Sequence, residues 1–418
     1  MKTAWRVALY HLALTALGAA VGLAAGVVCG IFGAGLQAIT ADAGENFAFN
    51  VWFLPLAGLL TAAVFRIGGG KTGGMAGVFR AARGESNGVP LRAVGIQFAG
   101  TWSAHLFCAS VGREGAAIQI GAALGSNIGG NLPLRDAGRL MTVAGMAAGF
   151  SALFMTPLAA FFFAMEVTFV GKLDGKALLP SLAASFAAYF AAGRLGLEAH
   201  TFILPVLPSF RWTLLAKTFA LGAIFGLAGL FFAFASRALR RFFHVAVKNP
   251  FVRVLAAGVM LSCLLYLTGG RYAGLGTDLA EAAFAGENMR AYDWAVKILF
   301  TAATLGAGFI GGEVTTMFAA GAALGAVLAE PFGISVQLAV CLGYAAVFGA
   351  STGTLLAPVF LGGEVFGFAA APYLAAACLA AYIFRFGQSV YGQRIFPRAL
   401  HLPRLRIPRA LPLPQRLY

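Results

Sequence analysis

The chain has 418 residues, of which 60% are hydrophobic and only 11% are charged, whereas soluble proteins carry about 25% charged residues. So few charges cannot coat the two or three soluble domains that this length would otherwise allow. The composition therefore predicts a polytopic membrane protein and excludes a nucleic-acid-binding protein, a secreted disulfide scaffold and a disordered chain. The net charge of +15 fits this class, because most Lys and Arg residues lie between apolar segments, where cytoplasmic positive charges orient membrane helices.

The N-terminal stretch begins with Lys2 and Arg6 and continues into an apolar run, 7–38, that is far longer than the core of a signal peptide. We expect a retained first membrane helix here. Of the segments that follow, several are too short to cross about 30 Å of hydrocarbon, and others are long enough to bend or break in two. In chain order they are 46–65, 93–110, 114–129, 140–170, 177–197, 213–236, 252–268, 292–309, 314–330, 334–350 and 352–384.

Two polar stretches and the C-terminal tail indicate the orientation in the membrane. Residues 66–92 carry several Arg and Lys residues, and residues 269–293 carry several Asp and Glu residues. The positive-inside rule places the first in the cytoplasm and the second on the opposite face. The basic, proline-rich tail 396–418 is predicted to lie in the cytoplasm near the lipid headgroups.

Glycine is unusually frequent, with 55 residues. Small residues allow membrane helices to pack closely, and they permit broken helices where the exposed backbone lines a protected cavity. The five cysteines lack metal-binding spacing and are predicted to pack as small core hydrophobes. They are Cys29, Cys108, Cys263, Cys341 and Cys378.

The chain repeats itself. Three pairs of segments occur in the same order at nearly the same separation: 112–115 with 311–314, 121–125 with 321–325, and 156–167 with 354–365. Duplicated halves in a membrane protein indicate a transporter whose site lies between them, and glycine-interrupted segments at matching places mark that site. We therefore predict a first half-repeat over 1–210, a second over 211–395, and a site built from 112–125 and 311–325.

Four carboxylates lie in apolar surroundings, where ionisable groups are costly and function is the default hypothesis. Glu114 stands between Gly112 and Gly115 at the predicted start of a helix, where free amides bind anions. Its carboxylate can compete with a free anion for those amides and can also carry a proton. Glu313, the equivalent residue in the second half, is either a second proton station or a helix cap. Glu166 and Glu364 are expected to bind backbone amides as structural ties.

The chain has no recognisable nucleotide-binding motif and no His/Cys metal cluster. Active transport would therefore draw on an ion gradient. A membrane-embedded enzyme that uses Glu114 as acid or base is the alternative of another class, but no nucleophile or metal ligand is found near Glu114.

These residues resemble a known family. Gly112-Arg113-Glu114-Gly115, with Gln119 in the glycine-rich helix behind it, resembles the gating motif of the CLC family of anion channels and proton-coupled antiporters. The segment 145–167 is similar to the helices that follow in that family. The resemblance covers residues 10–395. It implies an all-α polytopic membrane protein of the CLC-type inverted-repeat fold, with broken and re-entrant helices, and a homodimer with one anion pathway per subunit.

Four departures from chloride-type members resemble the fluoride-exporting branch, the CLC-F fluoride/proton antiporters. Met75 replaces a central serine, Ala116 replaces a proline, the later helix begins with Gly311-Gly-Glu-Val-Thr315, and Val167 replaces an inner proton glutamate. The branch also has a Tyr before a Gln near the last helix, here Tyr391 and Gln393.

The resemblance implies the following pathway residues: the gating glutamate Glu114 with Gly112, Arg113 and Gly115, the serine replacement Met75, the branch-specific pair Glu313 and Thr315, the tyrosine Tyr391, and Phe79. It implies a proton-coupled fluoride exporter in a bacterial inner membrane, with both termini cytoplasmic and with fluoride, protons and lipid as partners. No enzyme activity, metal or cofactor is expected. The residues alone indicate an anion transporter, and fluoride comes from the resemblance. A passive chloride or fluoride channel of the same fold is the alternative.

Overall fold

The computed structural model describes residues 2–68, 74–170, 173–205 and 209–395. Over these residues the chain is almost entirely helical, as the sequence predicted. Two short strands are the exception: β1 (Phe169–Val170) pairs in parallel with β2 (Arg394–Ile395). The predicted tail 396–418 and part of the segment that precedes Met75 lie outside the described residues.

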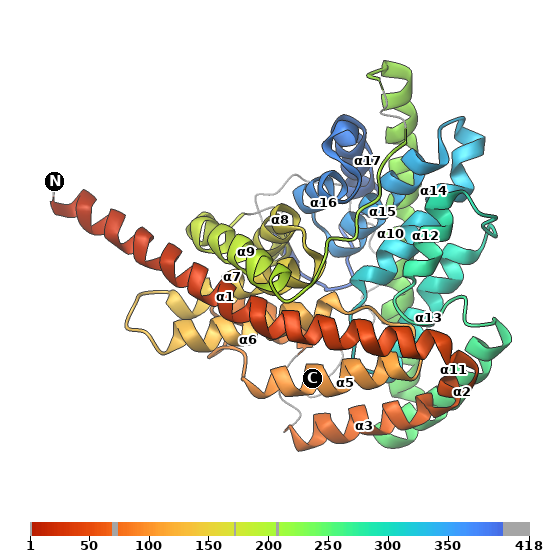
Figure 1. Cartoon of the computed structure of the whole chain (residues 1–418), viewed down its shortest axis with the longest axis horizontal. Coiled ribbons are helices and arrows are strands. Elements are labelled where there is room, and N and C mark those ends of the chain that lie inside the picture. The colour runs from red at the N-terminus through yellow and green to blue at the C-terminus, as the bar shows by residue number, and fades with distance from the viewer. Residues whose placement is uncertain (1, 69–73, 171–172, 206–208, 396–418) are drawn as a thin grey trace.

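The helices follow one another with short connections (Figure 1). The α-helices are α1 (Lys2–Glu45), α2 (Phe47–Asn50), α3 (Leu54–Ile67), α4 (Gly74–Ala82), α5 (Arg92–Leu106), α6 (Glu114–Gly130), α7 (Ala137–Phe154), α8 (Pro157–Val167), α9 (Leu178–Gly193), α10 (Trp212–Ala246), α11 (Pro250–Leu267), α12 (Thr277–Ala285), α13 (Asp293–Ala307), α14 (Val314–Phe332), α15 (Val336–Thr352), α16 (Leu356–Phe366) and α17 (Ala371–Phe384), and the 3₁₀ turns are η1 (Val51–Phe53), η2 (Gly175–Ala177) and η3 (Phe368–Ala370).

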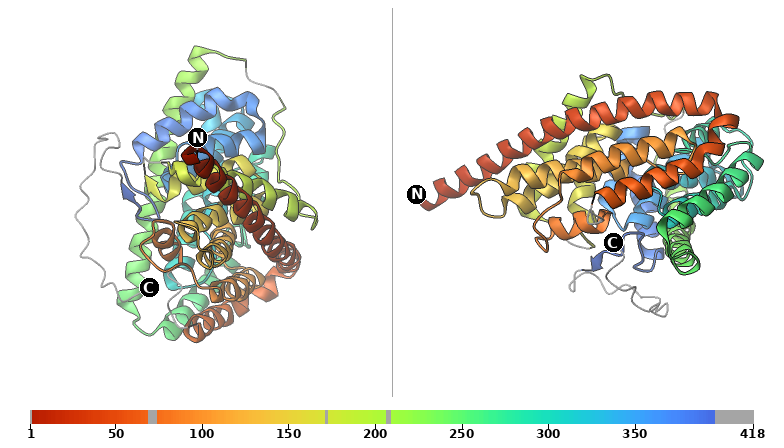
Figure 2. Two further views of the ribbon diagram at one scale, coloured as in Figure 1. Left: turned by 90° about the vertical axis from the view of Figure 1, so that its left-hand side faces the viewer. Right: turned by 90° about the horizontal axis from the view of Figure 1, so that it is seen from below.

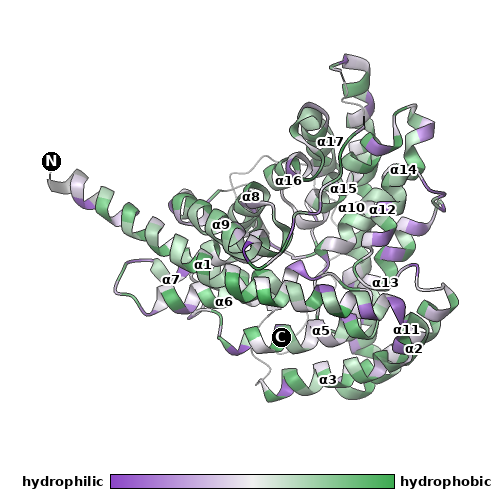
Figure 3. Cartoon of the chain, in the orientation of Figure 1, coloured by the Kyte–Doolittle hydropathy of each residue, from purple (hydrophilic) through white to green (hydrophobic). Residues whose placement is uncertain are grey.

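Six of the described helical stretches are long and apolar enough to cross a membrane. The N-terminal end of α1 extends beyond the other helices (Figure 2). Figure 3 shows hydrophobic residues along most of the helices, with hydrophilic residues mainly in the connections and at helix ends. Large apolar side chains such as Phe190 (57% exposed) and Leu267 (80% exposed) point away from the protein interior. An apolar exterior of this kind is suited to lipid rather than to water.

Two of the three longest predicted segments are broken, as expected, whereas 7–38 lies within the single helix α1. Segment 140–170 is divided into α7 and α8 at Met155, whose φ of 56° lies in the left-handed region. Segment 352–384 is interrupted at Gly367, with φ of 93°, between α16 and the turn that leads into α17. A left-handed residue ends an α-helix because it turns the chain away from the helix axis.

Close packing of α6 against α7, and of α14 against α15, depends on glycine. A Cβ on Gly121 would lie 2.1 Å from the carbonyl oxygen of Gly145, and a Cβ on Gly321 would lie 2.1 Å from that of Gly343. Gly121 and Gly321 are matching residues of the repeated Gly-Ala-Ala-Leu-Gly sequence. The two copies therefore make the same backbone contact with the helix that follows.

One cysteine prediction is wrong. Four cysteines are buried, but Cys263 is exposed on α11. Its neighbours Met260 and Leu264 are each 42% exposed, so no helix among the described residues covers this face of α11. Apolar sequence alone does not distinguish a helix face that meets lipid from one that meets protein.

Candidate functional site

The two segments predicted to form the site meet at a pair of glycines. Gly112 and Gly312 form an antiparallel bridge in which the N–H of Gly312 donates to the carbonyl of Gly112 at 2.7 Å. A Cβ on Gly312 would lie 2.7 Å from the backbone nitrogen of Gly115. The approach leaves no room for side chains, so the N-terminal ends of α6 and α14 lie side by side.

The side chain of Glu114, the first residue of α6, lies at the N-terminal end of α14, the equivalent helix in the second half. Its side chain is fully buried, and its Oε2 accepts from the backbone N–H of Thr315 at 3.1 Å, from the hydroxyl of Thr315, and from the backbone N–H of Arg113 at 3.2 Å. Its Oε1 lies 3.6 Å from Nε of Arg113 without a hydrogen bond. The carboxylate thus fills the set of donors that an anion would need at this helix end.

A second set of candidate site residues surrounds Glu313, the N-cap residue of α14. Its side chain is partly exposed, and Arg240 of α10 and Glu114 are near enough to act on its charge. The hydroxyl of Tyr391 lies close to the Glu313 carboxyl but makes no hydrogen bond of ordinary geometry. The ring of Phe79 meets that of Tyr391 edge to face, with centroids 5.3 Å apart. Phe79, Tyr391 and Glu313 thus form one cluster beside Glu114.

Met75 lies in the first turn of α4, partly buried against the apolar core. It precedes Phe79 by four residues, and residues at this spacing share a helix face. The two side chains therefore extend from the same face of α4, on the side where Phe79 meets Tyr391.

Glu166 and Glu364 are tied to backbone amides, as predicted. Glu166 at the end of α8 accepts from the first backbone N–H groups of α16, at 3.0 to 3.1 Å. Glu364 at the end of α16 accepts from Leu158 and Ala159 at the start of α8, both at 2.9 Å. Each carboxylate therefore neutralises the positive N-terminal end of the other helix.

One buried cation was not predicted from the sequence. Lys297 of α13 is fully buried, and four oxygen atoms lie within hydrogen-bond distance of the three N–H groups of its ammonium. The signal was present in the sequence, because Lys297 is the single charged residue between Asp293 and Glu313. A lysine inside a membrane segment is as costly as a carboxylate.

Comparisons with known proteins identify the family of this chain. The sequence model of the family described as "Voltage gated chloride channel" matches residues 53–385. A "Chloride/fluoride channel protein" of Pseudomonas syringae pv. tomato is 34% identical over 370 residues, which cover 86% of this chain and 81% of that protein.

Solved structures give the same result for the fold. The crystal structure of a CLC-type fluoride/proton antiporter is 39% identical, with a TM-score of 0.89, over 92% of this chain and 98% of that one. A slow cyanobacterial Cl⁻/H⁺ antiporter has a TM-score of 0.73 at 19% identity, over 89% of this chain and 94% of that one, which supports the fold alone. The chain therefore belongs to the CLC family, has the CLC-type inverted-repeat fold expected from its sequence, and is a multi-pass membrane protein of anion transport.

Proposed function

We propose that this protein exports fluoride in exchange for protons, with Glu114 as the gate. The observation that carries the proposal is the contact of the Glu114 carboxylate with the N–H and hydroxyl of Thr315. The similarity to a fluoride/proton antiporter at 39% identity supports fluoride as the anion.

Glu114 couples the two ions because its charge state decides what fills the site. An ionised carboxylate occupies the donors at the start of α14, and fluoride can take them only when the carboxylate leaves. A protonated carboxyl competes poorly for those donors, so fluoride binding favours release of Glu114 with its proton. Exchange of a fluoride for a protonated side chain moves the two ions in opposite directions.

The donors at this site suit fluoride. Fluoride is small and strongly hydrated, so its transfer from water must be offset by strong hydrogen bonds. Thr315 supplies a backbone N–H and a hydroxyl, and the positive edges of aromatic rings such as Phe79 supply a weaker attraction. Met75 supplies no such donor, and its choice in this place has no explanation in the structure.

Glu313 is the second proton station in this proposal. It is partly exposed and lies within reach of the Glu114 charge, so it can pass a proton to or from Glu114. A proton crossing hydrocarbon needs polar groups or water along its route.

The orientation follows from charge. We place the basic ends of α3 and α10 in the cytoplasm and the acidic segment 269–293 outside, with both termini cytoplasmic and the protein in a bacterial inner membrane. The proposed half-repeats are 1–210 and 211–395. The homodimer would use the exposed apolar side chains of α9 and η3, which include Phe186 (46% exposed) and Phe368 (50% exposed), and lipid would cover the remaining apolar surface.

The test is transport in liposomes that contain the purified protein. A fluoride gradient should drive protons against their own gradient, measured with a pH-sensitive dye and a fluoride electrode. Fluoride flux without proton movement would contradict antiport and support the passive channel suggested by the name of the 34% identical relative. Proton movement driven by chloride but not by fluoride would contradict the choice of anion.

A further inference from the structure

Three of the four oxygen atoms around the Lys297 ammonium are carbonyl oxygens, which can only accept. Its Nζ donates to the carbonyls of Tyr272 at 3.0 Å, Ala273 at 3.2 Å and Gly274 at 2.8 Å, and to Oγ of Ser110 at 3.1 Å. Three carbonyl acceptors require three N–H donors, which an ammonium has and a neutral amine lacks. The surroundings are therefore built for the charged form of the side chain.

This charge has no close partner. Among the described residues, no ion pair includes Lys297. Asp278, which acts on it from a distance, is exposed to solvent. A buried charge without a counterion is costly to keep inside a protein. The hydrogen bonds do not by themselves explain why a cation is present, because an uncharged residue at 297 would avoid the free-energy cost of burying a charge.

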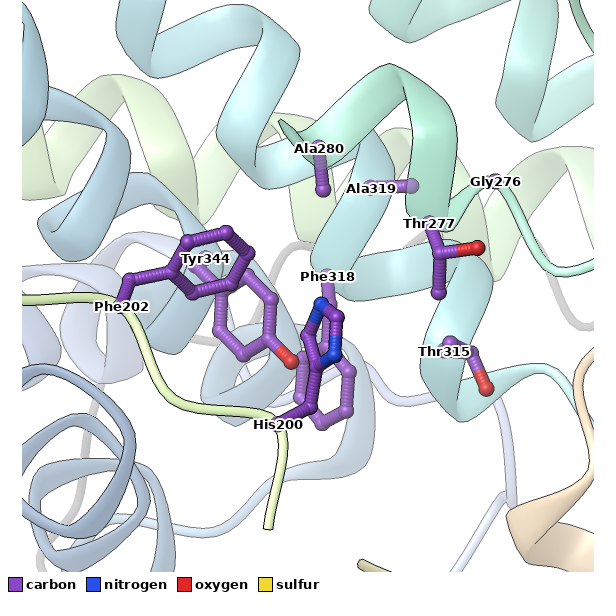
Figure 4. A pocket seen from close by; sticks show the side chains of 9 residues that line it. All are labelled: His200, Phe202, Gly276, Thr277, Ala280, Thr315, Phe318, Ala319 and Tyr344. Atoms are coloured by element: carbon purple, nitrogen blue, oxygen red, sulfur yellow. The ribbon is translucent and has the colours of Figure 1, made fainter. Parts of the chain in front are cut away.

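A small hollow of about 20 Å³, enough for one water-sized ion, lies next to this cation, between α12, α14, α15 and the connection that precedes α10. Figure 4 shows the hydroxyl of Tyr344 directed toward His200 on one side of the hollow, with Thr277 and Thr315 on the other side and their hydroxyls pointing away from it. His200 pairs with Glu281 at 3.0 Å, and both side chains are about half exposed. The hollow therefore extends from a solvent-exposed ion pair to Thr315, whose hydroxyl donates to Glu114.

Only a glycine separates Lys297 from this hollow. Gly276 lines the hollow, and a Cβ on it would lie 3.2 Å from Nζ of Lys297 and 2.9 Å from Cβ of Ala319, another lining residue. A side chain at residue 276 would clash with the lysine. The ammonium thus stands directly behind the wall, where the surrounding protein weakens its field less than water would.

We propose that Lys297 makes this hollow an anion-binding chamber outside the Thr315–Glu114 gate. The cation attracts the transported anion into the chamber, and the hydroxyl of Tyr344 offers it a hydrogen bond. This inference rests on the proposed function for the gate, for the orientation in the membrane and for the choice of fluoride as the probe ion. Lys297 does not touch the anion, so it is a positioning residue that acts through its charge.

The first experiment compares Lys297→Met with Lys297→Arg in liposomes, with fluoride influx measured from the face of the hollow. Loss of the charge should raise the half-saturating fluoride concentration about tenfold and leave the maximal rate largely unchanged. Lys297→Arg should restore most of the affinity. A folded Lys297→Met dimer with an unchanged half-saturating concentration overturns the proposal.

A second experiment avoids the risk that a Lys297 variant fails to fold. The variant is Thr277→Cys in a Cys263→Ser background. It is modified from outside with two methanethiosulfonate reagents that do not cross the membrane. The two reagents are similar in size and opposite in charge. Attachment of the negatively charged sulfonate reagent to residue 277 should raise the half-saturating fluoride concentration. Attachment of the positively charged trimethylammonium reagent should lower it. Thr268→Cys, in the connection that leads toward Gly276 but outside the hollow, is the control and should respond to neither reagent. Equal effects of the two reagents at residue 277, or no effect, overturn the proposal.

The outcomes separate this inference from the proposed function. Unmodified protein that carries no fluoride, or that moves no protons, contradicts the proposed antiport. The charge experiment is then run with the anion that the protein does carry, and the sign of the reagent effect still decides for or against the chamber.

Discussion

Gly112 and Gly312 donate their N–H groups to each other's carbonyls, at 2.5 and 2.7 Å, although they belong to the two separate copies of the repeated sequence. This contact places the first residue of α6 beside the first turn of α14. It is the reason that Glu114 reaches the N–H of Thr315 rather than the donors of its own helix. The distance between the starts of α6 and α14 is thus set by backbone contact, which glycine alone permits.

Gly312→Ala should disrupt the site. The added methyl group would lie 2.7 Å from the nitrogen of Gly115, so α6 and α14 must move apart and Glu114 must lose contacts with Thr315. Overpacking of this kind costs about 1–3 kcal/mol. We expect at least a tenfold loss of fluoride flux in liposomes. Gly95→Ala is the matched control, because its Cβ would meet nothing within 4 Å. Equal flux in both variants would show that the close contact is not required.

Glu114→Gln should abolish proton coupling. Glutamine keeps the shape of the side chain but has no ionised form, so it cannot exchange a proton as it leaves the Thr315 donors. We expect no proton movement against a gradient when fluoride flows, with any residual fluoride flux passive. Glu45→Gln, at the exposed end of α1, is the control and should transport normally. Proton pumping by the Glu114 variant would place the coupling group elsewhere.

Glu313→Gln should give a folded dimer with greatly reduced antiport. Glutamine keeps the shape and much of the hydrogen bonding of this side chain at the start of α14, so the variant should fold. It cannot release a proton, however, and the proposed route then lacks its second station. Flux in liposomes is measured beside a size-exclusion profile. Normal coupled transport by a monodisperse variant would make Glu313 a structural cap only.

Met75→Ser should change anion selectivity more than stability. Met75 shares a helix face with Phe79, which meets Tyr391, and a hydroxyl at this place adds a donor for larger anions. We expect the ratio of chloride flux to fluoride flux to rise severalfold. The temperature at which half of the dimer aggregates should change little, since Met75 is only partly buried. An unchanged flux ratio in a stable variant would place Met75 in packing alone.

Glu166→Gln and Glu364→Gln should each lower stability without changing selectivity. Each carboxylate accepts two or more hydrogen bonds from backbone N–H groups at the start of the other helix. In a glutamine, the NH₂ group would replace one accepting oxygen and would face those N–H groups without an acceptor. An unsatisfied buried donor costs about 1–3 kcal/mol. The double variant should lose less than the sum of the single losses if the two caps share one interface. Thermal aggregation of the purified dimers is the measurement, and a fluoride/chloride flux ratio equal to that of the wild type is expected beside it.

Composition and repetition alone determined much of this protein. A chain with 11% charged residues has to place most of its surface in lipid, and the lipid requires helices because their backbone groups are satisfied internally. The repeated segments and the carboxylates within them indicated the site, since ionisable groups do not persist in apolar surroundings without a partner or a function. The structural role of Glu166 and Glu364 was also predictable, because both lie at helix ends in matching segments.

Only the tertiary structure decided how these parts meet. That Glu114 binds Thr315 of the other half, and that Glu166 and Glu364 cap each other's helices, depends on the crossing of two halves that are far apart in the sequence. The exposure of Cys263 likewise depends on which helix face is covered. Lys297 shows the limit most clearly: its residue type was visible in the sequence, but its acceptors are backbone carbonyls of 272–274. Backbone carbonyls are present at every residue, so no sequence pattern marks the few that converge on one ammonium group.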